Sequence, residues 1–360
     1  MARSSFLQGA GLFSYSGTNC IRNDYFHNDC HICVDACPKG AFHIVRNRLT
    51  LFENECIACA ACIGSCPTEA LQIESFDPNT FVMAFGDSQN SELSCKKNTP
   101  CLGVFDQRHF ISMALERSFE CDLSHCEECE LNKDQKLAAR IRSNINKANN
   151  FFSQTGVERD VRIKEEKEVE HPRRALFRSA IGKAKESLQE RDENTSEALT
   201  RVHQAQMDLQ EPLKHLHLKQ MIRKHIGEFK TTSFDARSEL FTEKSIAFEA
   251  CTNCGECVQF CPTHALKATA DKQGIVFTSG ACIDCGICDD ICKTDAITTK
   301  DHIDIVNAVY DRSEELVHYE MVMCHECRCP YPYKGGDPIC DRCASFTTDF
   351  GNMFTLAKDL

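Results

Sequence analysis

Apolar residues occur along this chain in short groups, each bounded by polar or charged residues. No group approaches the run of about 20 apolar residues that a helix needs to cross a bilayer. Four groups share a pattern in which an alanine and a second apolar residue follow a turn: residues 37–42 (CPKGAF), 66–71 (CPTEAL), 261–266 (CPTHAL) and 292–297 (CKTDAI). We interpret each of them as a helical turn that leads into a strand.

Residues 78–150 show a different pattern. The apolar run TFVMAFG (80–86) predicts a buried strand. The segment DQRHFISMALERS (106–118) carries apolar residues at helical spacing, and the following FECD predicts a short strand. We therefore expect a small α/β unit with cysteines at its strand ends.

Residues 151–240 are dense in charged, helix-forming residues, and we expect a charged helical connector there. Residues 131–235 hold 21 Lys and Arg against 16 Asp and Glu, a net charge of +5, so −17 falls on the rest of a chain whose total is −12. We interpret the connector as a solvated helical spacer, with histidines 203, 215 and 217 as ordinary surface residues. A basic connector could also fold back on the acidic remainder or bind an acidic partner. Its intermittent apolar stripes include Leu176, Phe177, Ile181, Leu188, Leu216, Met221, Ile222 and Ile226.

Cysteine is the most informative residue type. Thirteen of the 26 cysteines lie at or before Cys129, thirteen lie at or after Cys251, and none lies between. The first residues lack the apolar core of a secretory signal, so we expect a cytoplasmic protein, in which thiols stay reduced. In that compartment such a pattern indicates metal binding rather than a disulfide framework.

Three stretches share the spacing C-x2-C-x2-C-x3-C: residues 56–66, 251–261 and 282–292. Proline follows the first two, and Lys293 follows the third. Three thiolates within seven residues suit one corner of an iron–sulfur cage, whereas a tetrahedral zinc site is usually built from two separated pairs. In the first stretch, the small and apolar residues between the cysteines allow backbone amides to approach the sulfurs and exclude water: Ile57, Ala58, Ala60, Ala61 and Ile63.

In this spacing and its repetition, residues 20–76 and 245–306 resemble the bacterial-type two-cluster [4Fe-4S] ferredoxin family, in duplicated form (a polyferredoxin). The resemblance implies two dicluster domains and four [4Fe-4S] clusters. Carried over by position, it assigns one cluster to Cys37, Cys56, Cys59 and Cys62, one to Cys251, Cys254, Cys257 and Cys292, and one to Cys261, Cys282, Cys285 and Cys288.

The remaining cluster has an irregular ligand set. Cys30, Cys33 and the remote Cys66 keep the spacing, but His27 stands where the first cysteine is expected. Cys20 could supply the fourth ligand, His27 could bind iron directly, or the site could hold a three-iron cluster with no fourth ligand.

The middle of the chain contains Cys95, Cys101, Cys126 and Cys129, with Cys121 left over. The phrase PCLG (100–103) and the later C-x2-C resemble small iron–sulfur subunits of heterodisulfide reductase-linked hydrogenases. That resemblance implies a fifth cluster on these four cysteines. A zinc site and unmetallated thiols are the alternatives.

Near the end of the chain, two C-x2-C pairs at Cys324, Cys327, Cys340 and Cys343 are separated by twelve residues, and Cys329 is spare. Two separated pairs predict a zinc-ribbon-like tail with a closed structural zinc, and another iron–sulfur cluster is the alternative. The tail is acidic, so we expect no binding to nucleic acid.

Taken together, the patterns predict an α+β protein with five parts: ferredoxin-like domains at 1–77 and 241–312, the small α/β unit at 78–150, the connector at 151–240 and the tail at 313–360. The sequence has no nucleotide-binding glycine loop and no recognisable catalytic constellation. We therefore expect a protein without an active site of its own, which relays single electrons as a subunit or accessory of a larger cytoplasmic redox enzyme such as a dehydrogenase or hydrogenase. The expected partners are redox enzymes or electron carriers, and the oligomeric state is left open. Acidic residues favour docking on a basic partner: Asp284, Asp289, Asp290 and Asp295.

The alternative function is that of a maturation or assembly factor for a molybdoenzyme or another metalloenzyme. The phrase HPRRALFRS (171–179) resembles an arginine-rich phrase of ferredoxin-type maturation proteins of molybdoenzymes.

Overall fold

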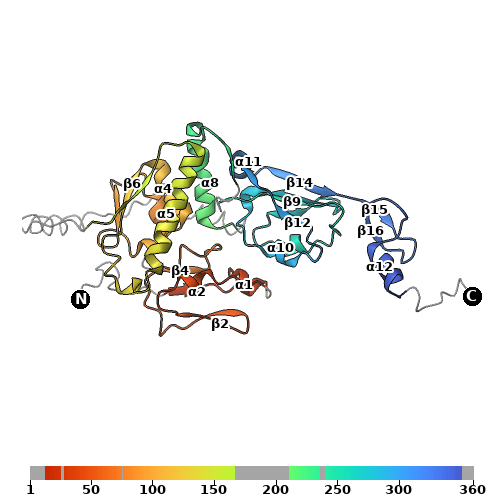
Figure 1. Ribbon diagram of the computed structural model, residues 1–360, viewed down its shortest axis with the longest axis horizontal. Helices are drawn as coiled ribbons and strands as arrows, with labels where there is room; N and C mark the ends of the chain where they lie inside the picture. Colours follow the sequence, from red (N-terminus) through yellow and green to blue (C-terminus); the bar gives the residue numbers. More distant parts are fainter. Residues whose placement is uncertain (1–12, 26–27, 75, 167–210, 236–239, 351–360) are drawn as a thin grey trace, which may run out of the picture. The chain divides into compact units, whose positions relative to one another are not determined.

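A computed structural model describes residues 13–25, 28–74, 76–166, 211–235 and 240–350 (Figure 1). The chain divides into two compact units, Met1–Phe234 and Asp235–Leu360. Each unit is described by itself below. The five-part boundaries predicted from the sequence stay predictions.

The N-terminal part of the first unit is built on two antiparallel strand pairs. Strand β1 (Phe13–Tyr15) pairs with β4 (Leu71–Ile73), so the segments before and after the cysteine-rich loops lie side by side. Strands β2 (Phe42–Val45) and β3 (Arg48–Leu51) form a hairpin whose turn residues have positive φ. Two short helices, α1 (Ile21–Asp24) and α2 (Ile32–Ala36), complete this part.

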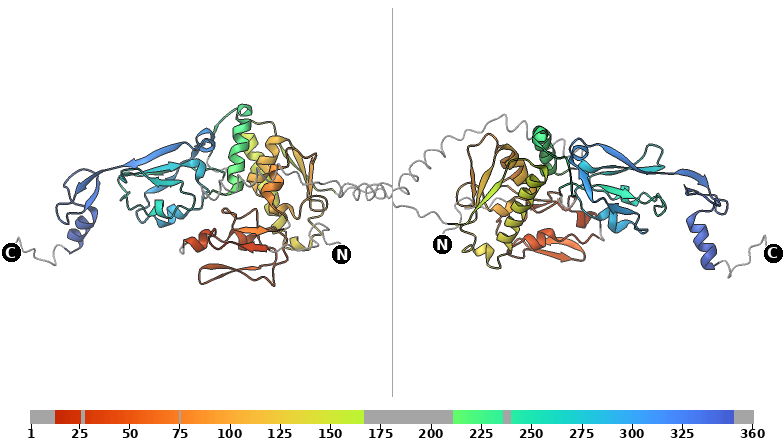
Figure 2. Two further views of the ribbon diagram at one scale, coloured as in Figure 1. Left: turned by 180° about the vertical axis from the view of Figure 1, so that it is seen from behind. Right: turned by 45° about the horizontal axis from the view of Figure 1, so that its top comes forward.

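The rest of the first unit contains a parallel sheet with strand order β5-β6-β7, in which the strands are β5 (Glu92–Ser94), β6 (Phe119–Asp122) and β7 (Val161–Lys164). Helix α4 (Gln107–Glu116) packs against both α5 (Lys136–Thr155) and α8 (Leu213–His225), and the three helices lie side by side in Figures 1 and 2. Phenylalanine rings dominate this core. The remaining elements are α3 (Pro78–Met83), η1 (Leu102–Val104), η2 (Glu130–Asn132) and η4 (Ile226–Glu228). Strand β8 (Ser233–Asp235) contains the boundary between the two units.

The expectation of a strand at residues 80–86 is wrong, because residues 80–83 belong to helix α3 and residues 84–86 form a turn. Asp77 caps the helix by accepting hydrogen bonds from the backbone N–H groups of Asn79 and Thr80, and Pro78 occupies its first turn. The cap and the proline fix the start of a helix, and they outweigh the strand preference of the apolar run. The predicted helix at 106–118 and the predicted strand at 119–122 are present as α4 and β6.

The expectation of a solvated spacer is wrong for the described parts of the connector. Strand β7 extends the central sheet, and helix α8 buries Leu218, Met221 and Ile222. His215 is also buried, and His217 is largely so, which corrects their assignment as surface residues. Residues 167–210, with His203 and the arginine-rich phrase at 171–179, lie outside the described residues.

The second unit repeats the plan of the N-terminal part of the first. Strand β9 (Lys244–Ile246), before the cysteine loops, pairs with β12 (Ile297–Thr299) after them. Strands β10 (Leu266–Ala268), β11 (Gly274–Thr278) and β14 (Ser313–His318) form an antiparallel sheet. The shared plan agrees with an internal duplication. The other elements are α9 (Glu256–Gln259), η6 (Ser279–Ala281), α10 (Ile287–Ile291), β13 (His302–Asp304), α11 (Ile305–Val309), β15 (Glu320–Met323), β16 (Pro330–Tyr333) and α12 (Asp341–Phe350).

Candidate metal centres

The first unit brings two of the predicted cysteine quartets around two small cavities. Site 1 consists of Cys20, Cys30, Cys33 and Cys66, which line one cavity together with Tyr15 and Leu49. Cys20 lies at the N-terminus of α1 and is buried, so the structure brings it to the position that the irregular spacing left open. His27 lies outside the described residues, and the choice of fourth ligand stays a prediction.

Site 2 consists of Cys37, Cys56, Cys59 and Cys62, which line the second cavity together with Phe13 and Phe42. The four cysteines come from two segments, because Cys37 follows α2 and the other three lie in the loop at 56–62. The spacing predicted this exchange of one cysteine between the two sites.

The second unit contains the other two predicted quartets. Site 3 consists of Cys251, Cys254, Cys257 and Cys292, which line one cavity. Site 4 consists of Cys261, Cys282, Cys285 and Cys288. Burial raises the pKa of Cys282, Cys285 and Cys288, and the charge of neighbouring thiolates of the group adds to the effect.

The loops of sites 2, 3 and 4 share one backbone signature. In each loop the residue before the middle cysteine and the residue after it have positive φ: Ala58 and Ala60, Asn253 and Gly255, and Asp284 and Gly286. Alternation of right- and left-handed conformations turns successive N–H groups toward one point and forms an anion-binding nest. Residues 28–37 of site 1 contain no positive φ, so the irregular first phrase also departs in backbone conformation.

The four repeated tails form a second conserved geometry within the chain. A residue with positive φ precedes the alanine in each tail, at positions Gly40, Glu69, His264 and Asp295. In three of the four tails the alanine N–H donates a hydrogen bond to the cysteine sulfur: Ala41 to Cys37 at 3.3 Å, Ala70 to Cys66 at 3.3 Å and Ala296 to Cys292 at 3.2 Å. Hydrogen bonds to ligand sulfurs stabilise negative charge on the cluster and raise its reduction potential.

The thiols in these sites favour binding of a cation. Burial raises the pKa of Cys33, Cys257 and Cys288 to about 12, and neighbouring negative charges, thiolates in all three cases and also Asp289 at Cys288, add to the effect. A metal centre supplies the positive charge that four grouped thiolates need, and its binding displaces their protons. All-sulfur donors at sites 1 to 4, and the convergent N–H groups at sites 2 to 4, fit iron–sulfur clusters.

A central site joins Cys95, Cys101, Cys126 and Cys129 at one edge of the parallel sheet. Cys95 follows β5 and Cys126 follows β6, so both lie at carboxyl ends of strands. The side chain of Asp122 joins these ends by accepting hydrogen bonds from Ser94 Oγ at 2.8 Å and Ser124 Oγ at 2.5 Å. Burial and neighbouring thiolates raise the pKa of Cys101 to about 12 and that of Cys126 to about 11. Cys121 is a separate, fully buried residue of β6.

The tail site differs from the others in size. The sulfurs of Cys324, Cys327, Cys340 and Cys343 lie within 4.8 Å of one another, with Cys327 and Cys340 at 3.8 Å. Zn–S bonds of about 2.3 Å in a tetrahedron place sulfurs about 3.8 Å apart. Across the described ranges, no other group of Cys, His, Asp or Glu is this compact. The wider spacing elsewhere fits cages in which each thiolate binds a different metal atom.

Hydrogen bonds from backbone N–H groups of Cys327 and Cys340 lower the pKa of Cys324 to about 6. This thiol therefore ionises readily and suits a zinc ligand. Cys329 is exposed and stands outside the group.

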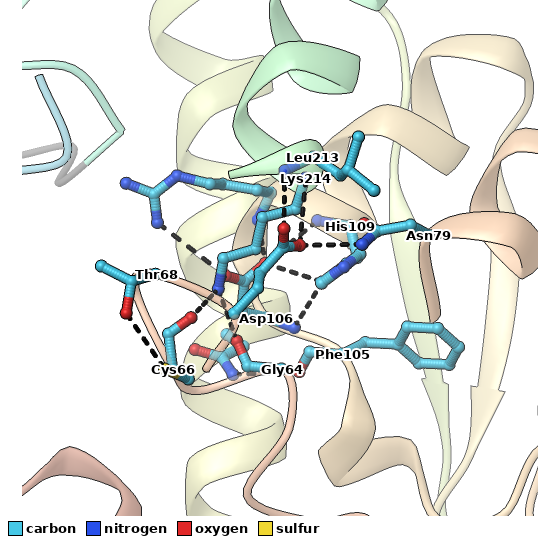
Figure 3. A network of polar contacts seen from close by, with 12 residues as sticks. Gly64, Cys66, Thr68, Asn79, Phe105, Asp106, His109, Leu213 and Lys214 are labelled. Atoms are coloured by element: carbon cyan, nitrogen blue, oxygen red, sulfur yellow. Dashed lines mark hydrogen bonds and ion pairs between the residues drawn. The ribbon is translucent and has the colours of Figure 1, made fainter. Parts of the chain in front are cut away.

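A buried ion pair next to site 1 is not marked by any cysteine motif (Figure 3). The Lys214 ammonium donates hydrogen bonds to the carbonyl oxygens of Gly64 at 2.8 Å and Cys66 at 2.7 Å. Burial alone would raise the pKa of Asp106, but Lys214 and His109 outweigh it and hold that pKa well below its usual value. The capping pattern of Asp106 and His109 is visible in the sequence, whereas Lys214 comes from a segment more than 100 residues away.

None of the helices in the described ranges is both long and apolar enough to span a membrane.

Comparison with known proteins gives two family matches. Models described as 4Fe-4S dicluster domain match residues 28–71 and residues 243–293. The chain is 39% identical over 54 residues to the arsenate respiratory reductase iron–sulfur subunit ArrB of Shewanella sp. (strain ANA-3), an alignment that covers 15% of this chain and 23% of that protein. It is 40% identical over 43 residues to a ferredoxin of Rickettsia felis, covering 12% of this chain and 39% of that protein. No solved structure matches.

The chain thus contains two 4Fe-4S dicluster domains in an α+β framework, and the predicted resemblance to a duplicated two-cluster ferredoxin is confirmed. The domains support binding of iron–sulfur clusters and an electron-transfer function. The chain spans well under half the length of either relative, and the alignments leave most of this chain unmatched.

Proposed function

We propose that this protein relays single electrons through iron–sulfur clusters as a subunit or accessory of a larger cytoplasmic redox enzyme. The observation that carries the proposal is the contiguity of three cysteine quartets in the first unit. Cys33 of site 1 lies close enough to affect the pKa of Cys62 of site 2. Cys59 of site 2 in turn affects the pKa of Cys101 in the central site.

Glycine makes the second of these approaches possible. A Cβ atom on Gly64 would lie 2.0 Å from the carbonyl oxygen of Val104, a distance that no side chain tolerates. The backbone just after the site 2 loop therefore packs directly on the segment that follows Cys101. Such packing suits electron transfer between neighbouring centres.

The cofactors that we propose are [4Fe-4S] clusters at sites 1 to 4, a further iron–sulfur cluster at the central site, and zinc at the tail site. The spacing of the sulfurs supports this division, because only the tail group is compact among the described residues. We assign no substrate-transforming site to the chain.

Exposed acidic residues of the second unit support docking to a basic partner. Asp284, Asp289, Asp290 and Asp295 are exposed near the site 4 and site 3 cysteines. A group of exposed acidic side chains accelerates association with a basic redox partner, and salt screens this attraction. The relay therefore predicts electron transfer whose second-order rate falls as ionic strength rises, and a flat salt response would contradict docking by charge.

The decisive experiment is anaerobic metal and sulfide analysis, followed by mixing of the reduced protein with a one-electron protein acceptor. Four four-iron clusters require about 16 irons and 16 sulfides per chain, and the central cluster adds to both counts. Rapid, reversible oxidation by the acceptor supports the relay. A preparation that binds zinc without labile sulfide would overturn it.

The maturation-factor alternative stays a prediction, and the same preparation separates it from the relay. A maturation factor binds its immature enzyme tightly whether the clusters are oxidised or reduced, and it shows no onward electron transfer. A relay transfers electrons and docks weakly.

A further inference from the structure

Arg140, on helix α5, lies where site 2 meets the central site. Its Nη2 atom donates a hydrogen bond to the carbonyl oxygen of Ala61, inside the site 2 loop between Cys59 and Cys62. A Cβ atom on Gly103 would lie 3.1 Å from the same Nη2 and 3.5 Å from the Ala61 side chain. The guanidinium therefore packs against the site 2 loop and against the turn that follows Cys101.

No carboxylate neutralises this charge within the described part of the chain. The polar contact of Arg140 there is the Ala61 carbonyl, and its Nε is buried without a hydrogen-bond partner. Burial lowers the pKa of Arg140, while the thiolates of Cys101, Cys62, Cys59 and Cys37 act in the opposite direction. An arginine stays protonated in proteins, so a fixed positive charge faces the sulfurs of two sites.

Two other buried cations near cluster ligands differ in this respect. Lys214, beside Cys66, has Asp106 Oδ2 at 2.7 Å. Lys244, which interacts with Cys288 and Cys282, has Asp289 Oδ2 at 2.8 Å. A paired cation exerts a weaker net field than an unpaired one at the same distance.

We propose that Arg140 is the residue that raises the reduction potentials of site 2 and the central site together, without favouring one of the two centres over the other. The inference rests on the proposed function, because it requires clusters at both sites. Reduction adds one negative charge to a cluster, and a nearby fixed cation stabilises the reduced form. In the exchange one electron leaves the reduced centre at site 2, which is oxidised, and reduces the centre at the central site, and no proton or ligand moves. Because one charge acts on both centres, both potentials shift in the same direction, and Arg140 adds little to the difference between them.

The test compares Arg140→Gln with Arg140→Lys in the full-length protein by anaerobic redox titration followed by EPR. Lys136→Gln is the control, since it removes the same charge from the same helix at a side chain that is 80% exposed. We expect Arg140→Gln to lower the ratio of reduced to oxidised cluster about tenfold at a fixed potential for two of the signals, which corresponds to about 59 mV for one electron. Arg140→Lys keeps most of the wild-type midpoints, and Lys136→Gln leaves all of them unchanged.

Unchanged midpoints in Arg140→Gln, with iron and sulfide contents equal to wild type, would overturn the inference and leave the relay intact. A shift in only one signal would also overturn it, because Arg140 would then affect the reduction potential of one centre alone. If Arg140→Gln loses iron, Arg140→Met serves as a second neutral variant. Loss of iron in both, with iron retained in Arg140→Lys, would show that the positive charge at residue 140 builds the site rather than tunes it, which would overturn the inference. Absence of clusters in the wild type would instead contradict the proposed electron relay itself.

Discussion

The ammonium of Lys214 lies 2.7 Å from Oδ2 of Asp106, and both side chains are removed from water, with 2% and 10% of their surfaces exposed. Asp106 caps helix α4, and Lys214 belongs to the first turn of α8. The same ammonium donates hydrogen bonds to the carbonyl oxygens of Gly64 and Cys66 (Figure 3). One buried cation thus joins two core helices to the segment that carries Cys66, a proposed cluster ligand of site 1.

Replacement of Lys214 by methionine should destabilise the protein strongly. The change leaves Asp106 buried beside two unsatisfied carbonyls, and loss of one partner from a buried pair costs about 3–5 kcal/mol. Anaerobic urea unfolding measures the free energy. Lys224→Met is the matched control on the same helix, because Lys224 is 59% exposed and its pair with Glu116 is worth about 0–1 kcal/mol.

The double variant Asp106→Asn with Lys214→Met provides a further check. It removes the uncompensated charge, so it should lose less stability than Lys214→Met alone. Equal losses would contradict the role of the ion pair.

The burial of His217 predicts that the free energy of unfolding depends on pH. Burial, with a smaller effect from His109, lowers its pKa to about 4 in the folded protein. The ordinary pKa is about 6.5, so between these values the unfolded chain binds a proton that the folded chain does not. The stability that neutral His217 contributes is therefore complete above about pH 6.5 and falls as the pH approaches 4.

The measurement is urea unfolding at pH 7.5 and pH 5.0 in wild type and in His217→Gln. Wild type should lose about 2 kcal/mol more than the variant over this interval, from 1.36 kcal/mol per pH unit. His43→Gln, at an exposed residue of the same unit, serves as the control. Equal pH dependence in wild type and His217→Gln would contradict the burial argument.

Replacement of Cys20 by alanine tests the ligand set of site 1. Cys20 lines the same cavity as Cys30, Cys33 and Cys66, so its loss should remove one iron and give a three-iron EPR signal in the oxidised protein. His27→Ala should leave the iron content unchanged. The reverse result would make His27 the fourth ligand.

Cysteine spacing anticipated which residues the structure brings together, since a C-x2-C-x2-C loop can fold only a few ways around one centre. Asp77 and Pro78 are typical of the start of a helix at Pro78–Met83. The apolar run that follows has a strand-like composition, so the sequence favoured a strand there. The environments of Lys214, His217 and Arg140 could not be predicted. Each depends on a partner segment remote in the sequence, and a charged residue on a helix ordinarily faces solvent.

The tail site gives a prediction that is independent of the clusters. Its four sulfurs lie within 4.8 Å of one another, too compact for a cage in which each thiolate binds its own iron and suited to a single tetrahedral ion. Cys340→Ser should therefore lower zinc from about one per chain to near zero, while iron and sulfide stay at wild-type levels.

Cys329→Ser is the matched control, because Cys329 lies in the same segment but outside the group. Elemental analysis of anaerobically purified protein measures both metals. Loss of iron in place of zinc from Cys340→Ser would mean that the tail holds a cluster. Loss of zinc from Cys329→Ser would mean that the ligand set differs from the one the sulfur geometry selects.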